Sequence, residues 1–142
     1  MGGCKSVKEY CNEPFIRELE ITMIEGEGSV VIEPTWEQVE NALAGFETNK
    51  VGRITIRNPR EVISMIIHGE ASVYHIGICE KETDFYYYWN GLETTDDTVD
   101  VAWNIFDANQ ICYDIITLQK IVHNFYKTGK RLEEVQWISE HL

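Results

Sequence analysis

The sequence has little basic character and no long apolar run. Twelve Lys and Arg residues stand against 24 Asp and Glu, which gives a net charge of −12 over 142 residues. Because nucleic-acid binding depends on a basic surface, this deficit argues against nucleic acid as a ligand. No apolar stretch approaches the ~20 residues of a membrane-spanning helix, and no basic segment followed by an apolar one opens the chain. We therefore expect a cytoplasmic protein that does not bind membranes.

Catalytic and metal-binding signatures are also missing. The sequence contains no Gly-rich phosphate loop, no Gly-x-Ser-x-Gly nucleophile segment and no His-Glu-x-x-His helix. The four cysteines form no Cys-x-x-Cys pair and have no metal-ligand spacing with the four histidines. They are expected to be reduced thiols, as is usual in the cytoplasm. No cofactor and no metal ion are expected.

The sequence shows no domain boundary. Only three prolines are present, and no Gly/Ser-rich linker, low-complexity tract or internal repeat interrupts the pattern. A chain of this length is large enough for one hydrophobic core. We expect a single domain over residues 1–142, in which residues 1–14 are poorly ordered.

Alternating apolar and polar residues predict a strand-rich chain. The expected strands are Phe15–Ile24, Ser29–Glu33, Lys50–Arg57, Val62–Ile67, Val73–Cys79, Phe85–Trp89 and Val99–Trp103. Gln110–Tyr113 is a further short β-prone run, and Val135–Ile138 is expected to return a large aromatic side chain to the sheet.

Two segments have the three- and four-residue spacing of an amphipathic helix. The first follows Thr35, which forms a capping box with Gln38. The second, Ile115–Lys127, follows the capping residue Asp114 and ends at Gly129, which adopts a left-handed conformation easily. The two apolar stripes comprise Trp36, Val39, Ala42, Leu43 and Phe46, and Ile115, Leu118, Ile121, Val122 and Phe125. The expected fold is α+β, a mostly antiparallel sheet of six to eight strands with two helices packed on one face.

Half of the net charge lies in one segment. Between Glu80 and Asp100 there are seven acidic residues and one basic, Lys81. The same segment contains the aromatic run Phe85–Trp89, in which Tyr86 and Tyr88 point to the opposite face from their neighbours. If one face closes the core, the other presents two tyrosines beside carboxylates, as in a binding surface for a basic protein. The alternative is a strand buried on both faces, next to an acidic turn that is merely solvated. The expected binding residues are Glu80, Glu82, Asp84, Tyr86, Tyr88, Glu93, Asp96, Asp97, Asp100 and Trp103.

Two other functions deserve comparison. Asp96, Asp97 and Asp100 with Glu93 could hold Mg²⁺ in a small metal-dependent enzyme, with His75 as a general base. Against this, carboxylates clustered in one loop are usually solvated, so no catalytic residue is assigned.

The start of the chain suggests the other alternative. Met1–Ser6 fits an acylation pattern, in which Gly2 and Cys4 would anchor an adaptor to a membrane. A pattern this short arises easily by chance, and a single acyl chain anchors only weakly.

Three segments of the C-terminal third resemble a known family. They are Val99–Asn104, Phe125–Gly129 and Val135–Trp137. Together they are similar to the C-terminal signature of the first of the numbered Imm families, bacterial immunity proteins that accompany polymorphic and contact-delivered toxins. In that family a Gly often stands where this chain has Trp103.

The resemblance implies a non-enzymatic protein that binds and neutralises the C-terminal domain of one cognate toxin, often a nuclease or a deaminase. Toxins that act on nucleic acid have basic clefts. An acidic, aromatic surface could cover such a cleft, so the resemblance favours the binding interpretation of the acidic segment.

Overall fold

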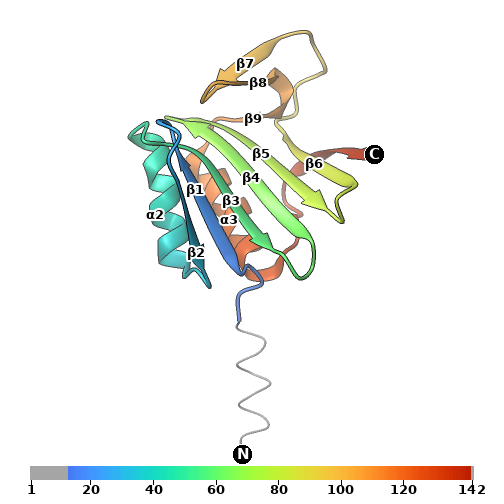
Figure 1. Cartoon of the computed structure of the whole chain (residues 1–142). Coiled ribbons are helices and arrows are strands. Elements are labelled where there is room, and N and C mark those ends of the chain that lie inside the picture. Colours follow the sequence, from blue (N-terminus) through green and yellow to red (C-terminus); the bar gives the residue numbers. More distant parts are fainter. Residues whose placement is uncertain (1–12, 142) are drawn as a thin grey trace, which may run out of the picture.

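An antiparallel sheet with two α-helices forms the body of the protein (Figure 1). It is seen in a computed structural model that describes residues 13–141. The Met1–Ser6 pattern and the expected poorly ordered start as far as residue 12 lie outside the described residues. Glu13 and Pro14, also assigned to that start, are described, and the Glu13 carboxylate accepts a hydrogen bond from Arg17 at 3.5 Å.

The secondary structure elements follow one another with short connections. They are β1 (Glu18–Met23), β2 (Gly28–Ile32), α2 (Trp36–Glu47), β3 (Val51–Asn58), β4 (Ile63–Glu70), β5 (Val73–Glu80), β6 (Asp84–Trp89), β7 (Thr98–Val101), β8 (Asn104–Asp107), the 3-10 helix η1 (Ala108–Gln110), β9 (Ile111–Cys112), α3 (Ile115–Thr128) and β10 (Gln136–His141).

The main sheet contains eight strands in the order β10-β6-β5-β4-β3-β1-β2, with β9 added to β5. Every adjacent pair is antiparallel. Strands β3 to β6 follow one another as consecutive hairpins, whereas β7 and β8 form a separate two-stranded hairpin. The α+β class, the antiparallel sheet and its strand number are confirmed.

The core lies between one face of the sheet and the two helices. Both predicted apolar stripes face it, although Trp36 and Ile115 are only half-buried at its margin. The helices supply Val39, Ala42, Leu43, Phe46, Leu118, Ile121, Val122, Phe125 and Tyr126, and the sheet supplies Leu19, Ile54, Ile56, Met65, Ile67, Ile76 and Ile78. Burial of this apolar surface is the main stabilising contribution to the fold.

The helix ends are those expected from the sequence. The Thr35 hydroxyl accepts from the Gln38 amide at 3.1 Å, and the Gln38 side chain accepts from the Thr35 amide at 2.9 Å. The Asp114 carboxylate accepts from the Ile116 amide at 3.1 Å. Gly129 ends α3 at φ +71°, and an added Cβ there would lie 2.4 Å from the Phe15 ring. Gly129 is therefore required both for its conformation and for space.

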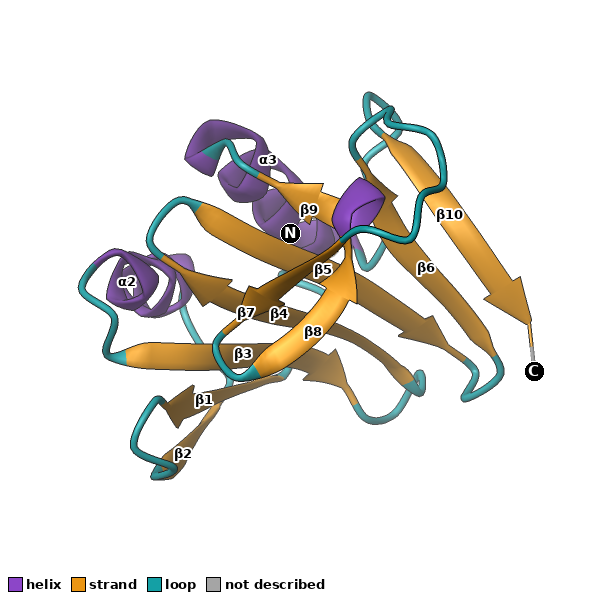
Figure 2. Cartoon of the chain, turned by 90° about the horizontal axis from the view of Figure 1, so that it is seen from above, coloured by secondary structure: helices purple, strands orange, loops and turns teal. Residues whose placement is uncertain are grey.

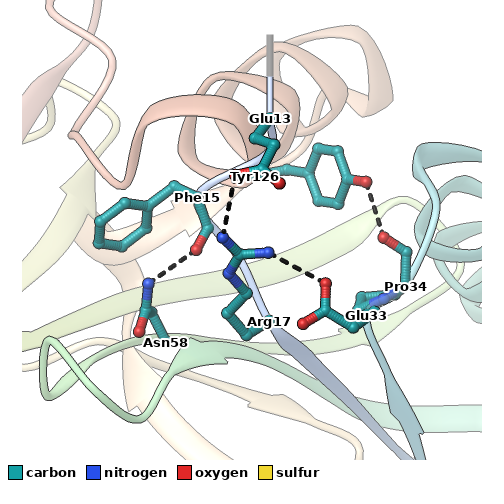
Figure 3. A network of polar contacts seen from close by, with 7 residues as sticks. All are labelled: Glu13, Phe15, Arg17, Glu33, Pro34, Asn58 and Tyr126. Carbon is teal, nitrogen blue, oxygen red and sulfur yellow. Dashed lines mark hydrogen bonds and ion pairs between the residues drawn. The ribbon is translucent and has the colours of Figure 1, made fainter. Parts of the chain in front are cut away.

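The segment before β1 is tied to the end of α3 and to β3 (Figure 3). The Phe15 amide donates to the carbonyl of Tyr126 at 3.0 Å, and the Asn58 side chain donates to the carbonyl of Phe15 at 2.8 Å. The Tyr126 hydroxyl donates to the carbonyl of Pro34 at 2.7 Å, a buried contact between residues 92 positions apart. These bonds join the first strand, the first helix and the last helix.

The predicted strand ends differ from the observed ones by up to three residues, and at one strand the difference changes the path of the chain. The segment Val99–Trp103 was expected to be a strand, but β7 ends at Val101 and the chain turns back at Ala102 and Trp103 into β8. Strand β8 was not predicted. The expected strand Val62–Ile67 is observed as β4, which extends to Glu70.

Candidate binding surface

The β7–β8 hairpin lies on the face of the sheet opposite the helices, over one end of β4 and β5 (Figure 2). The Phe106 ring of β8 stacks on the His75 ring of β5, with 3.7 Å between centroids and 9° between planes. Val101 of β7 is fully buried. The hairpin therefore has an inner side that packs on the sheet and an outer side that faces solvent.

Two residues without the freedom of glycine form the tip of this hairpin. Ala102 and Trp103 connect the paired residues Val101 and Asn104, with φ of +49° and +72°. Positive φ at both central positions is the pattern of a type I′ turn, which normally takes Asn-Gly or Gly-Gly. An L-residue in this conformation costs about 1–2 kcal/mol. The surrounding structure must therefore hold the turn in place.

Two side-chain hydrogen bonds hold it. The Glu70 carboxylate, at the end of β4, accepts from the Ala102 amide, and the Asn104 side chain donates to the Ala102 carbonyl at 2.9 Å. With the Phe106–His75 stack, these contacts fix the position of the tip relative to the main sheet.

The outer side of the hairpin combines large apolar side chains with carboxylates. The Trp103 side chain is 83% exposed and that of Ile105 is 70% exposed. Asp100 pairs with Ile105 in the ladder, and the exposed Asp107 ends β8. We refer to Asp100, Trp103, Ile105 and Asp107 as the hairpin surface. An exposed Trp beside an exposed Ile on a rigid element is typical of an interaction surface.

The segment of the sequence that contains the hairpin surface has acidic residues but no basic ones. Between Lys81 and Lys120 the sequence contains eight Asp and Glu residues and no Lys or Arg. Glu70, from another part of the chain, adds a carboxylate beside Asp100 and Trp103 in a surface pocket of about 390 Å³. No basic side chain is among the six residues that line this pocket. A basic partner would be attracted to this end of the molecule.

Among the predicted acidic residues of the β6–β7 loop, Asp97 is bonded to the base of the hairpin. Glu93, Asp96 and Asp97 are exposed, and the Asp97 carbonyl accepts from the Ala108 amide, directly after β8, at 3.0 Å. The structure therefore brings Asp97 to the base of the hairpin beside Asp107, at the opposite end of β7 and β8 from Trp103.

The other predicted carboxylates lie elsewhere. Glu80 ends β5, Glu82 lies in the following turn and Asp84 begins β6. They are separated from the Glu70 end of the sheet by the length of β5, roughly 24 Å. Glu80 lines a pocket with Lys130 and Arg131. The expectation of one continuous acidic surface from Glu80 to Asp100 is wrong, because β6 carries the chain across the sheet between its two halves.

The expected face of the two tyrosines is also wrong. Tyr86 pairs with Ile78, and both Tyr86 and Tyr88 pack against the core on the helix side. The Arg131 guanidinium lies over the Tyr86 ring, 3.7 Å from its centroid. The solvent side of β6 presents Phe85 and Tyr87 instead. Tyr86 and Tyr88 are thus half-buried structural residues and do not stand beside the carboxylates of the hairpin.

Sequence reasoning missed three residues of this end of the molecule. Ile105 and Asp107 belong to the strand that was not predicted, although the alternation Asn104–Asp107 is itself a strand pattern. Glu70 is brought in by a contact between residues 32 positions apart, for which no local signal exists.

A small cavity of about 170 Å³ lies beneath the hairpin and is lined mainly by apolar atoms. His68 and His75 face each other across β4 and β5 there, and Tyr87 covers Gly77 beside them. Burial, the neighbouring His75 and Arg53 lower the pKa of His68 to about 4. The Nδ1 atom of His68 is buried and has no hydrogen-bond partner among residues 13–141.

His75 is poorly placed for general base catalysis. Its side chain is 4% exposed and is covered by Phe106. Its Nε2 atom lies 2.7 Å from the Gln110 amide oxygen, so the imidazole is held as a hydrogen-bond partner. Burial lowers its pKa, which favours the neutral ring.

The described residues contain no group of three His, Cys, Asp or Glu side chains that could hold a metal ion. Asp96, Asp97 and Asp100 with Glu93 therefore do not form the magnesium site considered above. Cys79 and Cys112 are free thiols, whereas Cys4 and Cys11 lie outside the described residues. Over the part of the chain that is described, no helix has the length and apolar character needed to cross a membrane.

Comparison with known proteins shows the fold alone. No protein-family model and no curated protein matches the chain. The crystal structure of a hypothetical protein from Neisseria gonorrhoeae is similar, with a TM-score of 0.60 and 15% sequence identity. The alignment covers 83% of this chain and 91% of that one. The architecture is thus shared by nearly the whole length of another protein.

Proposed function

We propose that this chain is a cytoplasmic, non-enzymatic immunity protein that binds and neutralises one cognate toxin domain. The partner is a basic protein, the C-terminal domain of a nuclease or another toxin that acts on nucleic acid. The proposal combines the resemblance of the C-terminal third with the chemistry of the hairpin surface.

The observation that carries the proposal is the exposure of Trp103 in acidic surroundings. Trp is the side chain most often found as an energetic anchor in protein interfaces. Here it is 83% exposed at the tip of a hairpin that other contacts hold rigidly. Because the backbone that carries the indole is already held in place, the backbone loses little conformational freedom on binding, which favours affinity.

The carboxylates of the hairpin and of the loop before it supply steering and selectivity. Asp100 and Asp107 are exposed on the hairpin, and Asp96 and Asp97 are exposed directly before it. Acidic groups at the rim of an interface increase the association rate with a basic partner and disfavour acidic ones. A toxin that binds nucleic acid has a basic cleft and is therefore a basic partner.

The three segments of the resemblance have different roles in the structure. Phe125–Gly129 closes α3 against the core and the Phe15 ring. Val135–Trp137 leads into β10, where the Trp137 indole donates to the Leu132 carbonyl at 3.1 Å. These two segments stabilise the fold. The third, Val99–Asn104, forms the hairpin, so it is the segment in a position to contact a partner.

The test is kinetic binding to the toxin domain encoded next to this chain. Asp96→Lys with Asp97→Lys should slow association by about tenfold and flatten its salt dependence. Glu133→Lys with Glu134→Lys is the matched control, because it makes the same charge change at an exposed pair in the loop between α3 and β10. The control should bind like the parent. Equal association rates for both variants would contradict the role of the acidic end.

A further inference from the structure

The hairpin surface combines a flat aromatic ring with nearby negative charge, as a nucleotide does. The Trp103 indole offers a flat, exposed π-surface at the tip. Asp100 and Glu70 line the same pocket as Trp103, and Asp107 lies at the other end of β8. A nucleotide in a single strand likewise presents a flat base next to anionic groups. Proteins that bind single strands use aromatic side chains that stack on bases, within a positively charged groove.

We propose that the hairpin acts as a nucleotide mimic, with Trp103 occupying the place of a base in the nucleic-acid cleft of the toxin. This inference rests on the proposed function and specifies how inhibition occurs. The Trp103 indole stacks in the base site, and Asp100, Asp107 and Glu70 meet the basic groups that otherwise bind phosphates. Inhibition is then direct exclusion of the nucleic acid.

The exposure of Trp103 supports this assignment over a merely structural Trp. Trp103 has the φ of +72° that Gly would adopt freely, and its ring is 83% exposed. The side chain therefore contributes little packing to this protein while its backbone is strained. Positive φ values also occur at Lys81 and Glu82, so it is the exposure of a large aromatic side chain at such a position that distinguishes Trp103.

Four variants separate stacking from general apolar contact. Trp103→Gly removes the ring and relaxes the turn, so folding should be retained. It should weaken binding to the toxin domain by about 30-fold or more, as expected for an anchor. Trp103→Phe keeps an aromatic face and should lose less than Trp103→Leu, which keeps only apolar volume. Ile116→Gln, at an exposed position on α3, is the control and should bind like the parent.

Competition with nucleic acid tests the mimicry itself. A fluorescent single-stranded oligonucleotide, used as DNA and as RNA, is bound to a catalytically inactive variant of the toxin domain. The parent chain should displace it, whereas Trp103→Gly should fail to do so at the same concentration. Circular dichroism of each variant checks that it is folded.

The results distinguish a failure of the proposed function from a failure of this inference. If the parent chain does not bind the toxin domain, the proposed function and this inference both fail. If the parent binds and Trp103→Gly binds equally well, the inference alone is wrong. The inference is also wrong if Trp103→Gly binds weakly but the parent chain and the oligonucleotide bind the toxin domain at the same time. It is wrong as well if the toxin domain binds no oligonucleotide.

Discussion

The Phe106 ring lies parallel to the His75 imidazole, with 3.7 Å between their centroids. His75 belongs to the main sheet and Phe106 to the separate hairpin, so this stack joins the two parts of the structure. Phe106 also contacts the His68 ring, with 5.1 Å between centroids. The position of the hairpin surface depends on these contacts and on the bond from Ala102 to Glu70.

Removal of the Phe106 ring should therefore loosen the hairpin. Phe106→Ala loses the stack and part of its apolar burial, and should cost about 1–3 kcal/mol of unfolding free energy. Hydrogen exchange should become faster at the amides of β7 and β8. The control is Ile105→Ala, the next residue, which is 70% exposed and should cost less than about 0.5 kcal/mol. Equal effects at the two positions would show that the hairpin does not depend on the stack.

The same contacts predict a pH dependence of stability. His68 faces Arg53 on β3 and His75 on β5, while His75 also faces Asp107 and Tyr87. Burial lowers the pKa of His68 to about 4 and also lowers that of His75. A lowered histidine pKa means that the unfolded chain binds protons more readily than the folded one. The contribution to stability is then fully present above about pH 6.5 and is lost as the pH falls toward 4.

Denaturant melts between pH 7 and pH 5 measure this loss. His68 is partly exposed, so we expect it to account for a decrease of only about 1 kcal/mol over this range. His68→Asn should reduce the decrease, because it removes the histidine whose pKa burial lowers. The account is contradicted if His68→Asn follows the same pH profile as the parent.

The strain at the hairpin tip predicts an unusual stability change. Trp103→Gly should leave the unfolding free energy equal or raise it by up to about 1 kcal/mol, since Gly adopts φ +72° without strain. Ile105→Gly, in the adjoining strand, should instead lower it by about 0.5–1 kcal/mol. Thermal melts of both variants measure the difference. A loss above about 1 kcal/mol for Trp103→Gly would show that the indole supports the fold.

The core makes a conventional prediction. Leu118 and Phe125 of α3 are fully buried against the sheet, so Leu118→Ala or Phe125→Ala should cost about 2–5 kcal/mol. Ile116→Ala changes an exposed residue of the same helix and should cost less than about 0.5 kcal/mol. Small losses at both buried positions in denaturant melts would exclude α3 from the core.

The helices were predicted well because their signals are local. The stripe from Leu118 to Phe125 repeats at helical spacing, and Asp114 and Gly129 mark the two ends. Strand positions were predicted for the same reason, since alternation of period two is visible within a few residues.

The candidate site was predicted less well, because its geometry depends on strand faces, turns and long-range contacts that the local sequence does not determine. In Phe85–Trp89 every side chain is aromatic, so alternation gives two faces but does not identify the one that meets the core. The Ala102–Trp103 turn lacks the Gly or Asn that normally indicates a type I′ hairpin, so β8 was missed. Glu70 reaches Ala102 only through the folded sheet.

The central claim is that this chain silences a toxin by binding it. The most direct measurement is the activity of the toxin domain encoded next to this chain, titrated with the purified protein. We predict that toxin activity falls in proportion to added protein and is abolished near one equivalent, with Trp103→Gly requiring a large excess. Full toxin activity in the presence of about a tenfold molar excess of the parent chain over the toxin would contradict this claim.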